Sequence, residues 1–168
     1  MLLAAWPGGT PAVVGLLVAP VFVALRGLCN LLDGLVAVEG NLRTASGELF
    51  NDLPDRVSDL LLYVAAGHAV IGSAWGVELG WAAAALAIMT AYVRYLGGAM
   101  RAGQSFLGPM AKTHRMACLS AGCVAAAVEF GVRGSTLSLL VSLAAIAIGC
   151  VITIARRAMR IHRVLEAR

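Results

Sequence analysis

Five long stretches rich in apolar residues, separated by short polar links, constrain this chain more than any other feature. They cover residues 11–37, 47–71, 78–100, 115–132 and 136–155. A run of roughly 20 apolar residues is long enough to cross a bilayer as an α-helix. Only 13% of the 168 residues are charged, whereas a soluble domain usually has about 25%. The sequence therefore predicts an all-α polytopic membrane protein, a bundle of about five full transmembrane helices in a single domain over residues 1–168.

The first ten residues contain a short apolar segment of their own. It ends in the run Trp6-Pro7-Gly8-Gly9-Thr10. An aromatic residue that suits the membrane interface, followed by helix breakers, is typical of the end of one hydrophobic segment and the turn before the next. We therefore expect that a first helix upstream of residue 11 is missing or truncated.

Basic residues gather on one side of the predicted membrane. The links at 38–46 and 99–114 and the tail after residue 155 lie on the same side, because two spans separate each from the next. The basic residues of that side are Arg43, Arg101, Lys112, Arg115, Arg156, Arg157, Arg160, Arg163 and Arg168. The opposite side holds Arg133 alone. Because cytoplasmic loops carry the excess of Lys and Arg, we predict a bacterial inner (plasma) membrane protein with residues 38–46 and its tail in the cytoplasm.

The tail arginines favour one class of partner and disfavour another. Arginines at a membrane edge attract anionic lipid headgroups, so we expect membrane lipids to contact the tail. The basic residues do not alternate with aromatic ones, and we expect no nucleic-acid partner.

Polar side chains gather where the first span ends and the second begins. Asn30 and Asp33 are three residues apart, and Asn51, Asp55 and Asp59 are four apart, so each set shares one face of a helix. Carboxylate and amide oxygens are the ligands that hard divalent cations prefer. Ionisable groups beside a membrane span are costly and by default mark a functional site. The spacing therefore predicts a cation site between the two helices, with Arg26 pairing with a neighbouring acid.

The spacing from Asn30 to Asp55 resembles the signature of the CDP-alcohol phosphatidyltransferases, D-x2-D-G-x2-A-R-x8-G-x3-D-x3-D. The positions that match are Asp33, Gly34, Ala37, Gly47 and Asp55. Three positions depart from it, with Asn30 and Asn51 in place of aspartates and Val38 in place of the arginine. The segment 108–115 also resembles the basic loop before the fifth helix of that family.

The resemblance implies a six-helix membrane enzyme of phospholipid biosynthesis. It would transfer a phosphatidyl group from a CDP-diacylglycerol-type lipid to an alcohol acceptor, with release of CMP, and a homodimer is expected. The implied ligands of Mg²⁺ or Mn²⁺ are Asn30, Asp33, Asn51 and Asp55, with Asp55 also the catalytic base. The implied nucleotide-binding residues are Asp33, Gly34, Ala37 and Gly47. The implied acceptor-binding residues are Arg94, Lys112 and Arg115.

The two asparagines leave a second function open. Four aspartates would bring a charge of −4 to the cations, whereas Asn30, Asp33, Asn51 and Asp55 bring −2. The chain could therefore be a catalytically silent relative that binds a CDP-lipid or a partner enzyme. A small transporter or channel subunit is a third hypothesis, but its polar residues should line a path across the membrane, and here they gather at one side.

Overall fold

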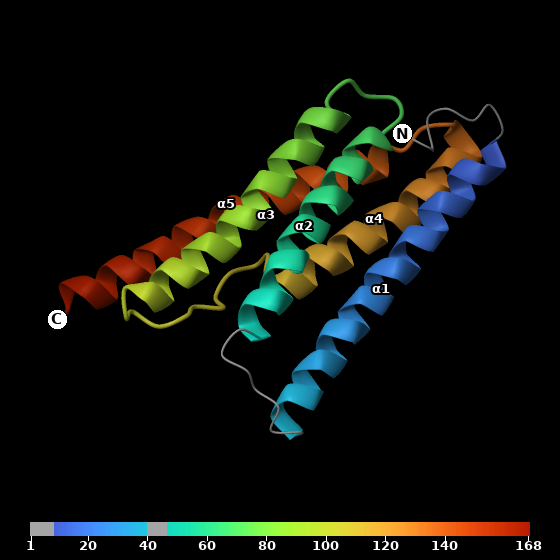
Figure 1. Ribbon diagram of the computed structural model, residues 1–168. Helices are drawn as coiled ribbons and strands as arrows, with labels where there is room; N and C mark the ends of the chain where they lie inside the picture. The colour runs from blue at the N-terminus through green and yellow to red at the C-terminus, as the bar shows by residue number, and fades with distance from the viewer. Residues whose placement is uncertain (1–8, 40–46) are drawn as a thin grey trace.

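The computed structural model, which describes residues 9–39 and 47–168, consists of five α-helices (Figure 1). The helices are α1 (Gly9–Glu39), α2 (Gly47–His68), α3 (Gly76–Ala99), α4 (Lys112–Arg133) and α5 (Leu137–Glu166). No β-strand occurs in these two ranges. The predicted all-α bundle is confirmed. The expectation of a missing first helix concerns residues that lie outside the described part of the chain.

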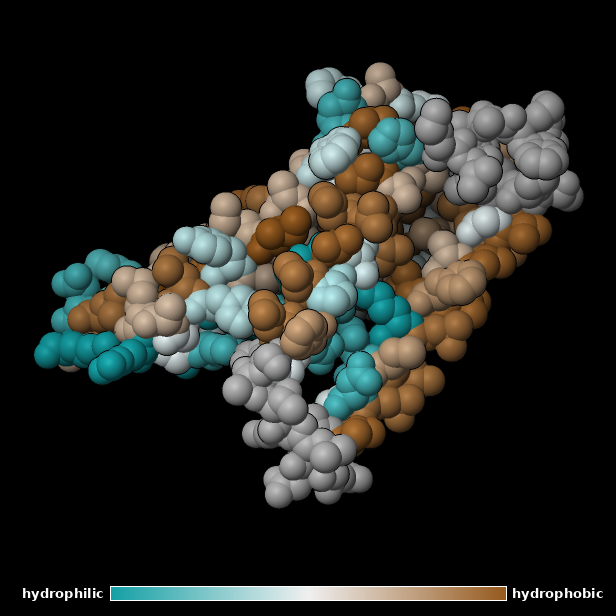
Figure 2. All heavy atoms as spheres, in the orientation of Figure 1, coloured by the Kyte–Doolittle hydropathy of each residue, from teal (hydrophilic) through white to brown (hydrophobic). Residues whose placement is uncertain are grey.

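Four helices are long and apolar enough to cross a membrane, namely α1, α3, α4 and α5. The chain is therefore a multi-pass membrane protein. The fifth, α2, has 22 residues and is not apolar enough to be counted with them, because four acidic residues and an arginine lie between residues 48 and 59. Figure 2 shows hydrophobic residues along the middle of the bundle and hydrophilic ones toward the C-terminal end of α5.

The helices pack in the order α2, α3, α5, α4, α1. The two edges of the bundle are therefore α1 and α2, although these helices follow one another in the sequence. At one edge, α1 packs mainly on α4 and stands apart from α2 over most of its length (Figure 1). At the other, α2 and α3 touch through glycines: a Cβ on Gly80 would lie 2.8 Å from both the Cα of Gly67 and the carbonyl of Tyr63. Small residues allow this close approach of two membrane helices.

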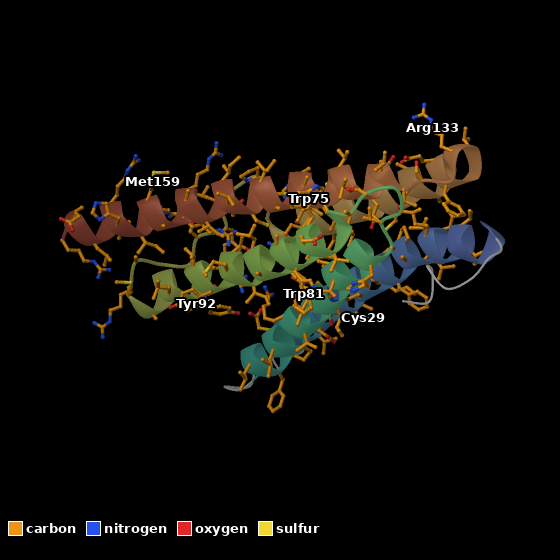
Figure 3. The ribbon with its side chains drawn as sticks, turned by 90° about the horizontal axis from the view of Figure 1, so that it is seen from above. Cys29, Trp75, Trp81, Tyr92, Arg133 and Met159 are labelled. Atoms are coloured by element: carbon orange, nitrogen blue, oxygen red, sulfur yellow. The ribbon has the colours of Figure 1, made fainter. Side chains whose placement is uncertain are left out.

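The last helix is longer than the sequence predicts. The expected span ends at residue 155, but α5 continues to Glu166 and has 30 residues in all. At 1.5 Å per residue it is about 45 Å long, whereas the hydrocarbon core of a bilayer is about 30 Å thick. Its last turns therefore extend beyond the membrane. Met159 in this extension and Arg133 at the end of α4 lie at opposite ends of the molecule (Figure 3).

Candidate functional site

The first and second helices meet through polar side chains. In α1, Arg26 and Asn30 are one turn apart and both contact Asp55 of α2. The Nη2 of Arg26 donates to the Oδ1 of Asp55 at 2.9 Å, and the Nδ2 of Asn30 donates to the same oxygen at 3.1 Å. The prediction that Arg26 pairs with a neighbouring acid is confirmed, and two residues of the signature-like motif, Asn30 and Asp55, are brought into contact.

A third helix completes the surroundings of Asp55. Its second carboxylate oxygen, Oδ2, accepts a hydrogen bond from the Nζ of Lys112, the first residue of α4. Arg56 lies 4.0 Å from the same oxygen. Asp55 is 8% exposed, so its charge is balanced by protein cations in a largely buried place.

Asp59, one turn further along α2, is fully buried between two arginines. Its Oδ1 accepts from Arg26 at 2.9 Å, and its Oδ2 accepts from the Nη2 of Arg115 at 3.3 Å. Arg115 also donates to the hydroxyl of Thr90 at 2.8 Å and to the carbonyl of Met110 at 3.1 Å. These bonds join α1, α2, α3 and α4, so Asp59 fixes the relative position of the helices that carry the site.

Arg94 of α3 contacts Asp52, which precedes Asp55 on α2 by three residues. Its Nη2 donates to the hydroxyl of Tyr95 at 2.9 Å and to the Oδ1 of Asp52 at 3.4 Å. Its guanidinium also stands 4.7 Å from the ring centre of Tyr95 and 5.4 Å from that of Phe106, which is the range of cation–π contacts. The aromatic rings therefore hold this arginine in place beside the site.

Arg157 lies at the site and not at the lipid surface. The prediction that it contacts lipid headgroups together with the other tail arginines is wrong. Arg157 is 4% exposed and donates to the carbonyls of Thr90 at 2.6 Å and of Leu107 at 2.9 Å. The described residues give it no carboxylate partner. The signal was its spacing: Thr153, Arg157 and Ile161 are four residues apart and all lie on the buried face of α5.

These side chains line a cavity of about 260 Å³. Its charged lining residues are Asp52, Asp55, Arg56, Arg94, Lys112, Arg115 and Arg157. Five basic groups against two acidic ones leave a surplus of three positive charges. Because uncompensated charge in a partly buried place is costly, the cavity is suited to an anionic ligand. All three basic residues that the resemblance gives to the acceptor, Arg94, Lys112 and Arg115, belong to it.

An apolar groove of about 360 Å³ adjoins this cavity between α1 and α4. Most of its surface is apolar and comes from residues such as Val23, Ala24 and Met116, while Arg26 and Asn30 also line it. Lys112 and Thr113 line both the groove and the cavity. Figure 2 shows hydrophilic side chains at the hollow between α1 and the rest of the bundle. An amphipathic ligand could therefore place an apolar chain in the groove and an anionic group at Lys112.

The other predicted site residues are not gathered into the cavity. Asp33 and Asn51 are exposed and make no side-chain hydrogen bond or ion pair with another described residue. A Cβ on Gly34 would meet nothing within 4 Å, and Gly47 is the half-buried first residue of α2. The side chain of Ala37 lies outside the described part of the structure.

The four motif side chains carry the oxygen atoms that a hard divalent cation prefers as ligands, and Asn30 and Asp55 are the two that the structure brings into contact. The facing parts of α1 and α2 run in opposite directions (Figure 1), so the contact of Asn30 with Asp55 sets Asp33 and Asn51 one turn further along the same two faces. All four side chains offer oxygen donors. No three Asp, Glu, His or Cys side chains of the described residues converge on one point. A cation at Asp55 would compete there with Lys112 and Arg26.

No protein-family model, curated protein or solved structure matches this chain. The function is therefore argued from the spacing of the motif and the geometry of the site. The site consists of a cationic cavity with the carboxylate of Asp55 at its wall and an apolar groove beside it.

Proposed function

We propose that this chain transfers a substituted phosphate group from a CDP-linked lipid to an alcohol acceptor and releases CMP. The observation that carries the proposal is the contact of Asn30 with Asp55 at the wall of a cavity with three surplus positive charges. It joins the two halves of the signature-like motif at a place suited to phosphate. The apolar groove beside Lys112 supports a lipid as one of the two substrates.

The basic residues of the cavity would bind the phosphates and orient them. Arg115 is held by Asp59, Thr90 and the carbonyl of Met110, so its position is fixed before a ligand arrives. Lys112 lies where groove and cavity join, which is where the phosphate of a lipid in the groove would come. Fixed positive groups of this kind stabilise the negative charge that develops on a transferring phosphoryl group.

In the proposed reaction, the hydroxyl oxygen of the acceptor forms a bond to the lipid-side phosphorus. The phosphoanhydride bond to CMP breaks, and CMP leaves with the bonding electrons. Asp55 would accept the proton of the hydroxyl, as a carboxylate within hydrogen-bond reach can. Mg²⁺ or Mn²⁺ at Asn30, Asp33, Asn51 and Asp55 would, when bound, neutralise charge on the phosphates.

The test is release of CMP from CDP-diacylglycerol by purified protein in detergent, with Mg²⁺ or Mn²⁺ and a panel of alcohols. Asp33→Asn is the sharpest variant, because an exposed side chain without partners among the described residues should not affect folding. We expect it to lower acceptor-dependent CMP release by roughly a hundredfold or more. Glu78→Gln, an exposed acid of α3 away from the cavity, is the matched control and should retain the activity of the parent chain.

A second function, a silent relative that binds a CDP-lipid without turning it over, is favoured by one observation. Both carboxylate oxygens of Asp55 are already engaged, by Arg26 and Asn30 on one side and Lys112 on the other. A carboxylate held in this way is less available to a cation or a substrate proton.

The same assay separates the two functions. Binding of CDP-diacylglycerol is measured in parallel, by thermal stabilisation of the protein. A chain that is stabilised by the lipid but releases no CMP with any metal or alcohol is the silent relative. A chain that shows neither stabilisation nor release has neither function.

A further inference from the structure

A second basic cleft lies outside the proposed site, at the end of α5. Its volume is about 340 Å³, and it is lined by Leu107, Gly108, Arg156, Met159, Arg160 and Arg163. It shares no lining residue with the cavity around Asp55. The proposed transfer reaction therefore makes no use of it.

Three arginines give the cleft its charge. Arg156, Arg160 and Arg163 follow one another at intervals of four and three residues, so they share one face of the helix. All three are exposed, and none forms an ion pair with an acidic residue in the described part of the chain. The one acid near the end of α5, Glu166, lies 3.9 Å from His162 instead. Arg160 donates to the hydroxyl of Ser105 at 3.3 Å, but a hydroxyl does not neutralise its charge. Three positive charges therefore face the cleft without an acidic partner in the described part of the chain.

The opposite wall of the cleft is a loop fixed tightly to α5. Arg157 donates to the carbonyl of Leu107 at 2.9 Å, and the hydroxyl of Thr153 accepts from the amide of Met110 at 3.1 Å. Gly108 has φ +130°, and a Cβ there would lie 2.5 Å from the Cγ2 of Thr153. Only glycine permits both this conformation and this approach. The wall is thus built in advance of any ligand.

The position of the cleft indicates where its ligand comes from. Arg156 is the twentieth residue of α5, which begins at Leu137, and about 20 residues cross the hydrocarbon core. The cleft therefore lies at the level of the lipid headgroups. Leu107 and Met159 are 55% and 51% exposed at its rim, and Met159 is on the side of α5 turned away from α3 (Figure 3). Arginines with apolar neighbours suit a phosphate that is attached to an acyl chain.

We propose that this cleft is a second anion site, which binds the phosphate of an acidic membrane phospholipid. The site is independent of the cavity around Asp55 and needs no turnover there. Arginine is suited to the role because its planar guanidinium can form two parallel hydrogen bonds to one phosphate.

The test measures lipids retained by purified protein in native mass spectrometry, with phosphatidylglycerol titrated against phosphatidylcholine. The cleft variant is Arg156→Gln/Arg160→Gln/Arg163→Gln. The matched control is Arg101→Gln/Arg133→Gln/Arg168→Gln, which removes three charges elsewhere. We expect phosphatidylglycerol to bind the cleft variant roughly tenfold or more weakly, and the control variant to bind it like the parent chain. Monodisperse elution and unchanged helical circular dichroism show that both variants fold.

Three results would overturn the proposal. Equal losses in the two triple variants would mean general attraction of anionic lipid to a basic surface. Equal retention of phosphatidylcholine and phosphatidylglycerol would mean that phosphate charge is not recognised. Stabilisation of the protein by inorganic phosphate or glycerol phosphate as strong as that by phosphatidylglycerol, and lost in the cleft variant, would identify the ligand as a soluble phosphate instead of a lipid.

Discussion

Two aspartates of the same sequence region have opposite surroundings. Asp59 is fully buried and receives hydrogen bonds from Arg26 and Arg115. Asp33 is exposed and has no partner among the described side chains. The buried carboxylate of Asp59 pairs with two guanidinium groups and so stabilises the fold. The exposed carboxylate of Asp33 does not contribute in this way and is accessible to a ligand. Substitution of Asp59 therefore tests a structural role, and substitution of Asp33 tests a functional one.

Asp59→Asn should destabilise the folded protein strongly. The change leaves two arginines near a neutral group, and breaking a buried ion pair costs about 3–5 kcal/mol. We expect the midpoint of thermal unfolding in detergent to fall by on the order of 10 °C. Asp33→Asn is the control and should leave that midpoint unchanged. Equal midpoints for the two variants would show that Asp59 does not hold the helices together.

The residues of the site were predictable only in part. The spacing of Asn30, Asp33, Asn51 and Asp55 indicated two facing helices, and the contact of Asn30 with Asp55 agrees with that. It could not indicate that Lys112 would reach Asp55, because this contact depends on how α4 packs beside α1. Arg157 was assigned to the lipid because its neighbours in sequence are arginines, although its helical position is on the buried face.

At the scale of whole elements, the N-terminus of α5 depends on an acid from α4. The carboxylate of Glu129 accepts from the hydroxyl of Ser135 at 2.6 Å and from the amides of Leu137 and Ser138 at 3.1 Å and 2.7 Å. These amides belong to the first turn of α5, where no intrahelical acceptor is available. Glu129 therefore performs for α5 the role that a capping residue has within a single helix.

Glu129→Ala should lower stability, because the amides of the first turn of α5 lose the carboxylate that accepts their hydrogen bonds. The measurement is again the thermal midpoint in detergent, which should fall by a few degrees. Arg133→Ala, one turn further along α4, is the control, because the described structure gives its side chain no ion pair or hydrogen bond. A midpoint for Glu129→Ala that matches the control would contradict the cap.

The contact of α2 with α3 depends on the absence of side chains at its glycines. Gly80→Ala would place a Cβ 2.8 Å from two backbone atoms of α2, so the helices would have to separate. We expect a loss of about 1–3 kcal/mol, as for other overpacked cores. Gly131→Ala is the matched control in α4, since a Cβ there meets nothing within 4 Å. Because alanine favours helix over glycine, that variant should be as stable as the parent chain or slightly more so.

For the molecule as a whole, hydropathy predicted the five helices of the described residues and, except at the end of α5, placed their ends within three residues. An apolar stretch long enough to cross a membrane is expected to be helical, because an α-helix pairs all of its backbone polar groups within the segment. The order of packing was not predictable, since lipid-facing and helix-facing surfaces are equally apolar. Nor did hydropathy predict the length of α5, whose arginine-rich end continues the helix to Glu166.

The orientation of the molecule in the membrane is the last prediction. The loop between α3 and α4 and the end of α5 carry the basic residues, whereas Arg133 alone marks the opposite end. We therefore expect Gln104 on the cytoplasmic side and Ala74 on the other, both of them exposed in loops. In a variant without the four native cysteines, Ala74→Cys and Gln104→Cys are introduced one at a time. A membrane-impermeant maleimide should label Ala74→Cys on intact cells and Gln104→Cys only after the membrane is opened. The reverse pattern would put the cavity around Asp55 on the outer face, where a substrate that is made in the cytoplasm, as a CDP-lipid would be, could not reach it directly.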